Sequence, residues 1–531
     1  MNTEPKNVDA VVVGAGFAGI YMLYKLRQLG LHAIVIEAAD DIGGTWYWNR
    51  YPGARCDIES LEYSYQFSEE LQQEWEWSER YATQPEILRY LKHVVDRFQL
   101  RDGIMFKTRV NNADYDQGRD HWQVRTDTGA AFVARYLILA TGCLSCPNEP
   151  DIPGIKDFAG EKLFTANWPH DPVDFNGKRV GLIGTGSSGV QVMPHLAKSA
   201  AQLTVFQRTA SYVVMAGNQP LDPAVQRRVK SNYRQFRDFN SQQLTGADFD
   251  FSTELAVAAS PEERQRTFEA RWQKGGSGFF GAYADLVVSQ QANDYAAQFL
   301  RDKIRTLVKN PEVAAALCPK HAIGCKRLCL EDSYYQSFNQ DNVALVDIKK
   351  NPIQQVTAHG IQVDGRDIPL DTLVFATGFD AMTGAITRID IRGLDQLSIR
   401  DKWRESPKAY LGLMIAGFPN MFIITGPGSP SVFTNMVPSI EQHVNYIGDI
   451  ISYAAQHDYR RIDAEAQAED DWVAHVADIV KPTLLLGCNS WYLGANIPGK
   501  PRVFMPYLGY PAYVAECHEI AAQGYRGISF S

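Results

Sequence analysis

Residues 9–37 read DAVVVGAGFAGIYMLYKLRQLGLHAIVIE, and this stretch decides the fold. The apolar run 11–13 predicts a buried strand, and an apolar stripe of helical period predicts the helix after it. Gly30 can end that helix, and a second apolar strand then ends in Glu37. Between the first strand and the helix stand three glycines at G-x-G-x-x-G spacing, Gly14, Gly16 and Gly19. This order is typical of a chain that lays a dinucleotide pyrophosphate on the N-terminus of a helix.

Residues 179–208 repeat the pattern with a strand, a helix and a second strand. The glycines of this copy are Gly184, Gly186 and Gly189. Pro194 lies inside the second helix, which we expect it to kink or shorten. Each unit is later closed by a predicted hairpin and a strand that ends in Ala-Thr-Gly, at 140–142 and at 376–378. The duplication predicts an α/β fold with two Rossmann-like dinucleotide-binding domains.

The two units differ at the end of their second strand. Glu37 can accept hydrogen bonds from a ribose diol, as in the adenosine of FAD. Arg208 and Thr209 offer a cation and a hydroxyl at the matching place, which favours NADP over NAD because they can bind a 2′-phosphate. The alternative for Arg208 is a solvated surface charge. The sequence therefore predicts FAD at the first unit and NADP at the second.

The segments between the two units indicate how the domains are divided. Residues 222–308 are polar and have helical spacing, which predicts a helical insertion in the second domain. Residues 83–86 read TQPE, which predicts a capping box at the start of another helix. The chain after Ala381 begins no new dinucleotide unit and is expected to fold back onto the first domain. We expect these parts: FAD domain 1–145, NADP domain 146–220, helical insertion 221–325, second part of the NADP domain 326–380, and C-terminal part of the FAD domain 381–531.

The composition excludes several classes of protein. The 531 residues carry a net charge of −9, so a surface for nucleic acid or anionic lipid is not expected. The N-terminus lacks an apolar core, and the longest apolar run, 411–425, is too short to span a membrane, so we expect a cytoplasmic protein. Eight cysteines in a chain of this length indicate a reducing compartment. We expect free, mostly buried thiols at the paired positions Cys143, Cys146, Cys325 and Cys329, and no metal site.

Four segments resemble the flavin-dependent Baeyer–Villiger monooxygenases, a class B family. They are 43–57 (GGTWYWNRYPGARCD), 324–327 (GCKR), 375–382 (FATGFDAM) and 491–500 (WYLGANIPGK). The loop 426–436 (GPGSPSVFTNM) is most similar to the phenylacetone monooxygenase branch. The matches run from end to end of the chain. The resemblance implies an NADPH- and O2-dependent enzyme that converts a small-molecule ketone to an ester or lactone, with a site that accepts aryl, bulky or cyclic ketones.

The resemblance also implies how two residues act. In the family, a flavin C4a-peroxide attacks the ketone, and it must stay anionic to do so. Arg327 stands at the position of the arginine that stabilises this peroxide, and a guanidinium suits that task because it is always protonated. Asp57 matches the acid that orients the arginine. Taken alone, the pair could equally be a structural ion pair and a turn acid.

Further residues are carried over from the family by position. For FAD they are Gly14, Ala15, Gly16, Gly19, Glu37, Gly44, Thr45, Trp46, Tyr47, Trp48, Asp57, Tyr63, Val110 and Met436. The other cofactor-binding residues, most of them toward NADP, are Arg55, Gly184, Thr185, Gly186, Ser187, Ser188, Gly189, Gln191, Arg208, Thr209, Lys326, Arg327 and Trp491. The residues expected to border the substrate pocket are Ser431, Val432 and Phe433.

One position departs from the family pattern. The family motif F-x-G-x-x-x-H-x-x-x-W aligns with residues 158–168, and Phe164 stands where the histidine is expected. Phenylalanine can donate no hydrogen bond, so slower or partly uncoupled turnover, with loss of hydrogen peroxide, is one hypothesis. A sulfide or amine oxygenase, a pyridine nucleotide–disulfide oxidoreductase and a non-catalytic nucleotide sensor remain alternatives. Arg327 and Asp57 favour the ketone reaction, because a heteroatom attacks a neutral hydroperoxide and needs no anion.

Overall fold

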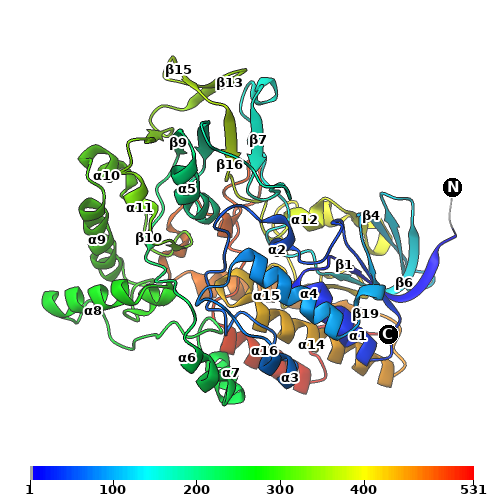
Figure 1. The fold of residues 1–531 in the computed structure, drawn as a ribbon. Helices are drawn as coiled ribbons and strands as arrows, with labels where there is room; N and C mark the ends of the chain where they lie inside the picture. The colour runs from blue at the N-terminus through cyan, green and yellow to red at the C-terminus, as the bar shows by residue number, and fades with distance from the viewer. Residues whose placement is uncertain (1–3) are drawn as a thin grey trace.

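Two β-sheets organise the chain, and each contains one of the two glycine-rich units (Figure 1). The computed structural model describes residues 4–531. It is an α/β fold with two Rossmann-like sheets, as the duplicated sequence pattern predicts.

The first sheet has the strand order β17-β4-β5-β6-β1-β2-β3, and β18 also pairs with β6. Its first strand, β1, lies between β2 and β6 and is parallel to both. The late strands β17 and β18 join this sheet, so the C-terminal part of the chain does fold back onto it. The strands are β1 (Lys6–Val13), β2 (Ala33–Ile36), β3 (Ile104–Met105), β4 (Val110–Asp116), β5 (His121–Thr126), β6 (Ala131–Leu139), β17 (Asp390–Arg392) and β18 (Met421–Ile423).

Helices from both ends of the chain cover this sheet. The apolar side of α1 packs against α14, and the largest hydrophobic core cluster includes residues of both helices. The helices and short elements of this part are α1 (Phe17–Gln28), α2 (Thr45–Trp48), α3 (Glu69–Glu74), α4 (Gln84–Arg97), α12 (Gly384–Thr387), α13 (Ile399–Lys402), α14 (Met436–Gln456), α15 (Ala466–Val480) and α16 (Tyr510–Ala522). A last hairpin pairs β19 (Ile462–Ala464) with β20 (Ile528–Phe530).

The second sheet is entirely parallel, with the order β12-β9-β8-β16-β7. Its strands are β7 (Glu161–Phe164), β8 (Arg179–Ile183), β9 (Gln202–Gln207), β12 (Val343–Asp347) and β16 (Thr372–Phe375). The predicted hairpin before the second Ala-Thr-Gly is present, as β14 (Gly360–Val363) and β15 (Arg366–Pro369), with β13 (Ile353–Thr357) beside β14. Helix α5 (Ser187–Ser199) follows β8.

The expected capping box at 83–86 was wrong, and of the two effects expected of Pro194, a kink or a shorter helix, the shortening does not occur. Pro194 does not shorten α5, which continues to Ser199, because buried residues such as Val190 and Leu196 pack it into the core. The capping box at 83–86 does not form: the Glu86 carboxylate accepts hydrogen bonds from the backbone N–H and the hydroxyl of Ser78 instead. A tertiary partner thus replaces the local one.

The predicted helical insertion is present between β10 (Val213–Val214) and β11 (Cys329–Leu330). Figure 1 shows α8, α9 and α10 on the side of the molecule away from the first sheet. The helices are α6 (Pro223–Lys230), α7 (Tyr233–Ser241), α8 (Pro261–Lys274), α9 (Gln290–Leu307) and α10 (Pro311–Leu317), and α11 (Tyr334–Ser337) follows β11.

The cysteines correct one further expectation. Cys325 forms a disulfide with Cys488, which is 163 residues away in the sequence, with a Cα–Cα distance of 6.0 Å. Spacing along the chain could not reveal this pair, because only the fold brings the two residues together. The other six cysteines are free thiols, as predicted, and all are buried except Cys318, which is half-buried.

Between residues 4 and 531, none of the helices is both long and apolar enough to cross a bilayer. Within the same residues, no three His, Cys, Asp or Glu side chains gather in a way that could hold a metal ion.

A buried carboxylate connects α14 to the loop between α2 and α3. Glu441 is almost fully buried, and its Oε1 accepts hydrogen bonds from the backbone N–H groups of Gln66 (3.0 Å) and Phe67 (2.9 Å). Burial raises the pKa of this carboxyl from 4.5 to about 7. A raised folded-state pKa contributes stability that is fully present below pH 4.5 and is lost as the pH rises through 7.

We expect Glu441→Gln to stabilise the protein at pH 8 and to have little effect at pH 4.5. Glutamine keeps the acceptor oxygen but carries no charge to bury, so the gain at pH 8 should be on the order of 3 kcal/mol. Thermal unfolding of the wild type and the variant at the two pH values measures it. The exposed Glu405→Gln serves as control. A gain that is the same at both pH values would contradict the assignment.

Candidate functional site

One cavity of about 1370 Å³ is lined by residues of both glycine-rich units. Its walls hold most of the residues that the sequence predicted for cofactor, catalysis and substrate. The predicted residues that line it are Gly14, Gly16, Glu37, Gly44, Thr45, Trp46, Trp48, Arg55, Asp57, Tyr63, Val110, Gly184, Thr185, Gly186, Ser187, Ser188, Gln191, Arg208, Thr209, Lys326, Arg327, Val432, Met436 and Trp491.

The predicted residues outside the lining are Ala15, Gly19, Tyr47, Gly189, Ser431 and Phe433. A methyl group added to Gly19 would collide with the Gly14 carbonyl, and one added to Gly189 with the Gly184 carbonyl, so these two glycines allow close packing of helix and strand. Tyr47 donates a hydrogen bond to Asp40 (2.5 Å) and faces away. Of the other three, Ala15 and Ser431 are fully buried, and Phe433 packs against Tyr492 and Phe504.

The first nucleotide site combines a tight turn, a helix N-terminus and an acid. Gly14 has a φ of +105°, a conformation that favours glycine, and α1 begins directly after Gly16. The buried Glu37 carboxylate accepts hydrogen bonds of 2.7 Å from the N–H groups of Ala15 and Ala39. Each of its oxygens can accept a further hydrogen bond from a ribose hydroxyl. Burial raises the pKa of this carboxyl.

The walls beyond that turn fit a flavin. Gly44 lies so close to Gly16 that a side chain on Gly44 would collide with the turn. Because both residues are glycines, the space over the N-terminus of α1 stays open for a phosphate. Trp46 donates a hydrogen bond from its indole N–H to the Tyr63 hydroxyl (3.2 Å), and Met436 lies at the start of α14. Apolar and aromatic walls of this kind suit the planar ring of FAD.

The second site gathers positive charge. Gly184 repeats the left-handed turn with a φ of +108°, and α5 begins after Gly186. Burial lowers the pKa of Lys326, and the nearby Arg208 and Lys349 lower it further. A nucleotide phosphate would offset this mutual repulsion, which fits the 2′-phosphate of NADP.

Lys349 was missed by the sequence analysis. It follows β12, the edge strand beside β9, and β9 ends just before Arg208. No motif marked Lys349, because it reaches the cavity only through the order of strands in the second sheet. A basic residue just after an edge strand of a predicted parallel sheet would have been the available signal.

The cavity wall contains a two-point ion pair. Arg327 donates from Nε to Asp57 Oδ2 (2.6 Å) and from Nη2 to Asp57 Oδ1 (2.9 Å). Its Nη1 donates to the Val432 carbonyl (2.9 Å). Burial opposes the charge on Asp57, but the Arg327 charge and hydrogen bonds outweigh it, so the pKa of Asp57 is lowered. By the same balance the pKa of Arg327 is raised, and the pair stays ionised.

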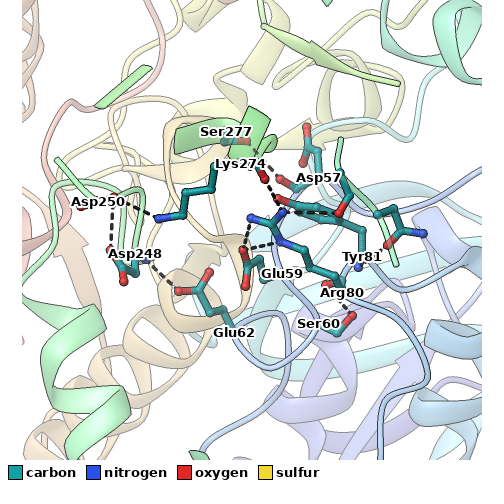
Figure 2. A network of polar contacts seen from close by, with 12 residues as sticks. Asp57, Glu59, Ser60, Glu62, Arg80, Tyr81, Asp248, Asp250, Lys274 and Ser277 are labelled. Carbon is teal, nitrogen blue, oxygen red and sulfur yellow. Dashed lines mark hydrogen bonds and ion pairs between the residues drawn. The ribbon is translucent and has the colours of Figure 1, made fainter. Parts of the chain in front are cut away.

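Figure 2 shows how the segment that carries Asp57 is braced. Ser277, from the insertion, donates a hydrogen bond to the Asp57 backbone carbonyl (3.2 Å). Arg80 joins the Glu59 carboxylate (2.8 Å) to the Lys274 carbonyl (2.9 Å). The Asp248 N–H donates to the Glu62 carboxylate in the same way (2.8 Å). The insertion therefore fixes the loop from which Asp57 reaches Arg327.

Tyr492 was also missed, although it follows Trp491 in a segment that carried the resemblance. Its side chain is buried against the Arg327 guanidinium, and burial raises the pKa of its phenol to about 12. Its ring centre is 4.5 Å from that of Phe433. Because neither contact follows from spacing, only the fold places Tyr492 beside the ion pair.

Phe164 stands at the edge of the second sheet. It ends β7, and its ring stacks on Phe375 of β16 with centroids 4.8 Å apart and planes at 17°. The aromatic contact replaces any polar contact that a histidine would make there. Trp168, the last residue of the same motif, is buried and donates its backbone N–H to the Trp48 carbonyl (3.3 Å).

Comparison with known proteins gives consistent relatives. Residues 11–248 match a family described as pyridine nucleotide-disulphide oxidoreductase. A Baeyer-Villiger monooxygenase of Pseudooceanicola batsensis is 44% identical, over 99% of this chain and 98% of its own length. The phenazine N-monooxygenase PhzNO1 of Lysobacter antibioticus is 42% identical, over 99% and 98%.

The solved structures agree with these relatives. An oxidised steroid monooxygenase bound to NADP is 47% identical over 99% of both chains, with a TM-score of 0.94. The closed crystal structure of cyclohexanone monooxygenase is 44% identical over 99% of both chains, with a TM-score of 0.97. An open structure of cyclohexanone monooxygenase, 42% identical over 99% of this chain and all of the other, has a TM-score of 0.92.

We expect Lys349→Ala to weaken the binding of NADP about fivefold, or ~1 kcal/mol, because an exposed cation that would attract the 2′-phosphate is lost. Binding of NAD, which lacks that phosphate, should not change. Titration of each nucleotide against the FAD-loaded protein measures both. Lys350→Ala, at the next residue, is the control because Lys350 does not line the cavity. Equal weakening for NADP and NAD would contradict the assignment.

Proposed function

The chain belongs to the flavin-dependent Baeyer–Villiger monooxygenases, and from that membership we propose that it oxidises ketones to esters or lactones with NADPH and O2. The observation that carries the proposal is the Arg327–Asp57 pair in a cavity bounded by two dinucleotide sites. The proposal divides the chain as the sequence predicts: 1–145 and 381–531 hold FAD, 146–220 and 326–380 hold NADP, and 221–325 is the insertion.

Bound FAD, once reduced by NADPH, supplies the activated oxygen for this chemistry. Asp57 engages Nε and one hydrogen of Nη2 of Arg327, and Val432 accepts one hydrogen of Nη1. Further hydrogens on Nη1 and Nη2 can therefore stabilise negative charge on a reacting oxygen. The bidentate grip fixes the plane of the guanidinium, so its hydrogens point in a set direction during the reaction.

The nicotinamide nucleotide has a second place in the proposal. Trp491 lies on the cavity wall, and Lys326 directly precedes Arg327 in the chain. Lys326 and Arg208 would hold a phosphate of the nucleotide, and Arg327 and Trp491 line the same cavity. The proposed role of NADP is thus to remain bound beside the flavin and to help enclose the reacting centre.

One relative supports a second candidate function. The phenazine N-monooxygenase oxidises nitrogen, to judge by its name, and shares 42% of its residues with this chain. Oxidation of a heteroaromatic nitrogen or a sulfide needs no anionic oxygen donor, so it depends less on Arg327. The same cavity could serve it.

The decisive experiment is NADPH oxidation by the FAD-loaded protein with a panel of cyclic, aryl and steroid ketones, sulfides and phenazines. Product mass and hydrogen peroxide are measured together. We expect esters or lactones with one added oxygen atom from ketones. N-oxides or sulfoxides without any ester would favour the second candidate, and peroxide alone from every substrate would refute both.

We expect Arg327→Lys to lower the rate of ketone oxygenation by about 10²–10³-fold, because one ammonium cannot reproduce the fixed guanidinium donors. Reduction of the flavin by NADPH should continue, and the released peroxide should rise. Arg179→Lys is a matched control, because Arg179 forms a similar two-point pair with Asp371 on the surface. Loss of flavin reduction in Arg327→Lys would show instead that Arg327 serves mainly to bind NADP.

We expect Phe164→His to change the coupling of NADPH oxidation to product. If the missing histidine contact slows oxygenation, the variant should give less peroxide per NADPH and a higher rate of ester formation. The stack on Phe375 is largely preserved by an imidazole, so stability should change little. Unchanged rate and unchanged peroxide yield would remove Phe164 as a cause of poor coupling.

A further inference from the structure

The disulfide Cys325–Cys488 joins two segments that both border the reacting centre. Cys325 is fully buried and directly precedes Lys326 and Arg327. Cys488 is half-buried, and three residues later the chain places Trp491 on the cavity wall. The bond therefore links covalently two parts of the cavity wall that are far apart in the sequence.

Residues 484–496, on the C-terminal side of this wall, make polar contacts with other parts of the chain at both ends. The Leu484 N–H donates to the Val287 carbonyl of the insertion (2.8 Å), and the Asn496 side chain donates to the Phe379 carbonyl (2.8 Å). Between them, Asn489 and Ser490 line the cavity, and the Ser490 hydroxyl is buried without a hydrogen-bond partner. The middle of the segment is also packed, because Tyr492 is buried against Arg327 and the Met505 N–H donates to the Tyr492 carbonyl (3.1 Å). These contacts are noncovalent, and the disulfide adds a covalent tie to them.

The backbone as a whole is more similar to a closed structure of a relative than to an open one. Its TM-score is 0.97 with the closed structure of cyclohexanone monooxygenase and 0.92 with the open one.

We propose that Cys325 and Cys488 form a reversible redox latch, which holds residues 484–496 against the Lys326–Arg327 segment when oxidised and frees them when reduced. The inference rests on the proposed function, because the latch would control how long NADP stays beside the flavin. An oxidised latch keeps the nucleotide in, and a reduced one lets it leave.

Hydrogen peroxide can oxidise the two thiols of the latch, and a dithiol can reduce the disulfide. Two thiols and one molecule of hydrogen peroxide give the disulfide and two molecules of water, and peroxide is the product that a flavin monooxygenase releases when oxygen is not transferred. In the opposite direction, the thiolate of a dithiol attacks the sulfur of Cys488, the half-buried member of the pair, and Cys325 leaves as a thiolate that takes up a proton. The second thiol of the reductant then resolves the mixed disulfide, and two electrons have been transferred.

The first test is the state of the thiols in the FAD-loaded protein. Without reductant, we expect six free cysteines and a peptide that links Cys325 to Cys488 by mass; with dithiothreitol, we expect all eight thiols. Addition of hydrogen peroxide to the reduced protein should restore the linked peptide. Eight free thiols in folded protein after peroxide would overturn the proposal.

The second test is the rate at which NADP leaves the FAD-loaded protein, measured by displacement without ketone. We expect reduction of the wild type to speed release about tenfold, because loosening a wall acts mainly on dissociation. Cys488→Ser should release NADP at the fast rate with or without dithiothreitol. Cys318→Ser, which removes a free, half-buried thiol outside the cavity, should respond as the wild type does. Equal rates in oxidised and reduced wild type would overturn the proposal.

These two tests separate the latch from the proposed function. Neither uses a ketone, so a protein that fails to oxygenate ketones can still show redox-dependent NADP release. Conversely, ester formation with equal NADP release in both redox states would leave the function standing and remove the latch. Reduction of the wild type alone, without substitution, guards against a variant that fails to fold.

Discussion

The close approach of a helix to a strand at two matching turns is the constraint on which the rest of the structure depends. At both turns, the place of a missing side chain, on Gly19 or on Gly189, is filled by a carbonyl oxygen of the preceding strand end. This contact aims the N-termini of α1 and α5 into one cavity. Two phosphate-binding ends directed at a shared space are what allow electrons to pass from one nucleotide to the other.

The Arg327–Asp57 pair then fixes the point where the two sites meet. Its partners come from segments 270 residues apart, and a half-buried ion pair contributes little net stability unless its geometry is held in place. The insertion holds it: Ser277 bonds the Asp57 backbone, and Arg80 ties the neighbouring loop to Lys274. The helical insertion therefore acts as a brace for the site, although none of its helices carries a predicted catalytic residue.

Much of this could be predicted from the sequence, because the decisive signals are local. Glycine spacing, strand and helix periodicity and the acid or arginine at the strand end report on adjacent residues, and the two sheets follow from them. Contacts between distant segments could not be predicted. The place of Lys349 depends on strand order, and that of Tyr492 on the packing of the C-terminal segment. The partner of Cys488 is 163 residues away in the sequence. Even a local rule failed where a tertiary donor, Ser78, took the carboxylate of Glu86.

The wall around Arg327 shows why those distant partners matter. A guanidinium can stabilise charge strongly only where water is excluded, so the cavity must be closed on the side that the sheets leave open. Residues 484–496 belong to neither sheet and supply part of that side of the wall through Trp491, with Tyr492 buried beside Arg327. The same closure opposes exchange of nucleotide, because a wall that excludes water also hinders NADP from leaving. Exclusion of water and exchange of nucleotide therefore place opposite demands on this wall. A bond that changes how firmly the wall is attached, without disturbing the ion pair, would serve both demands. The Cys325–Cys488 bond lies in such a position.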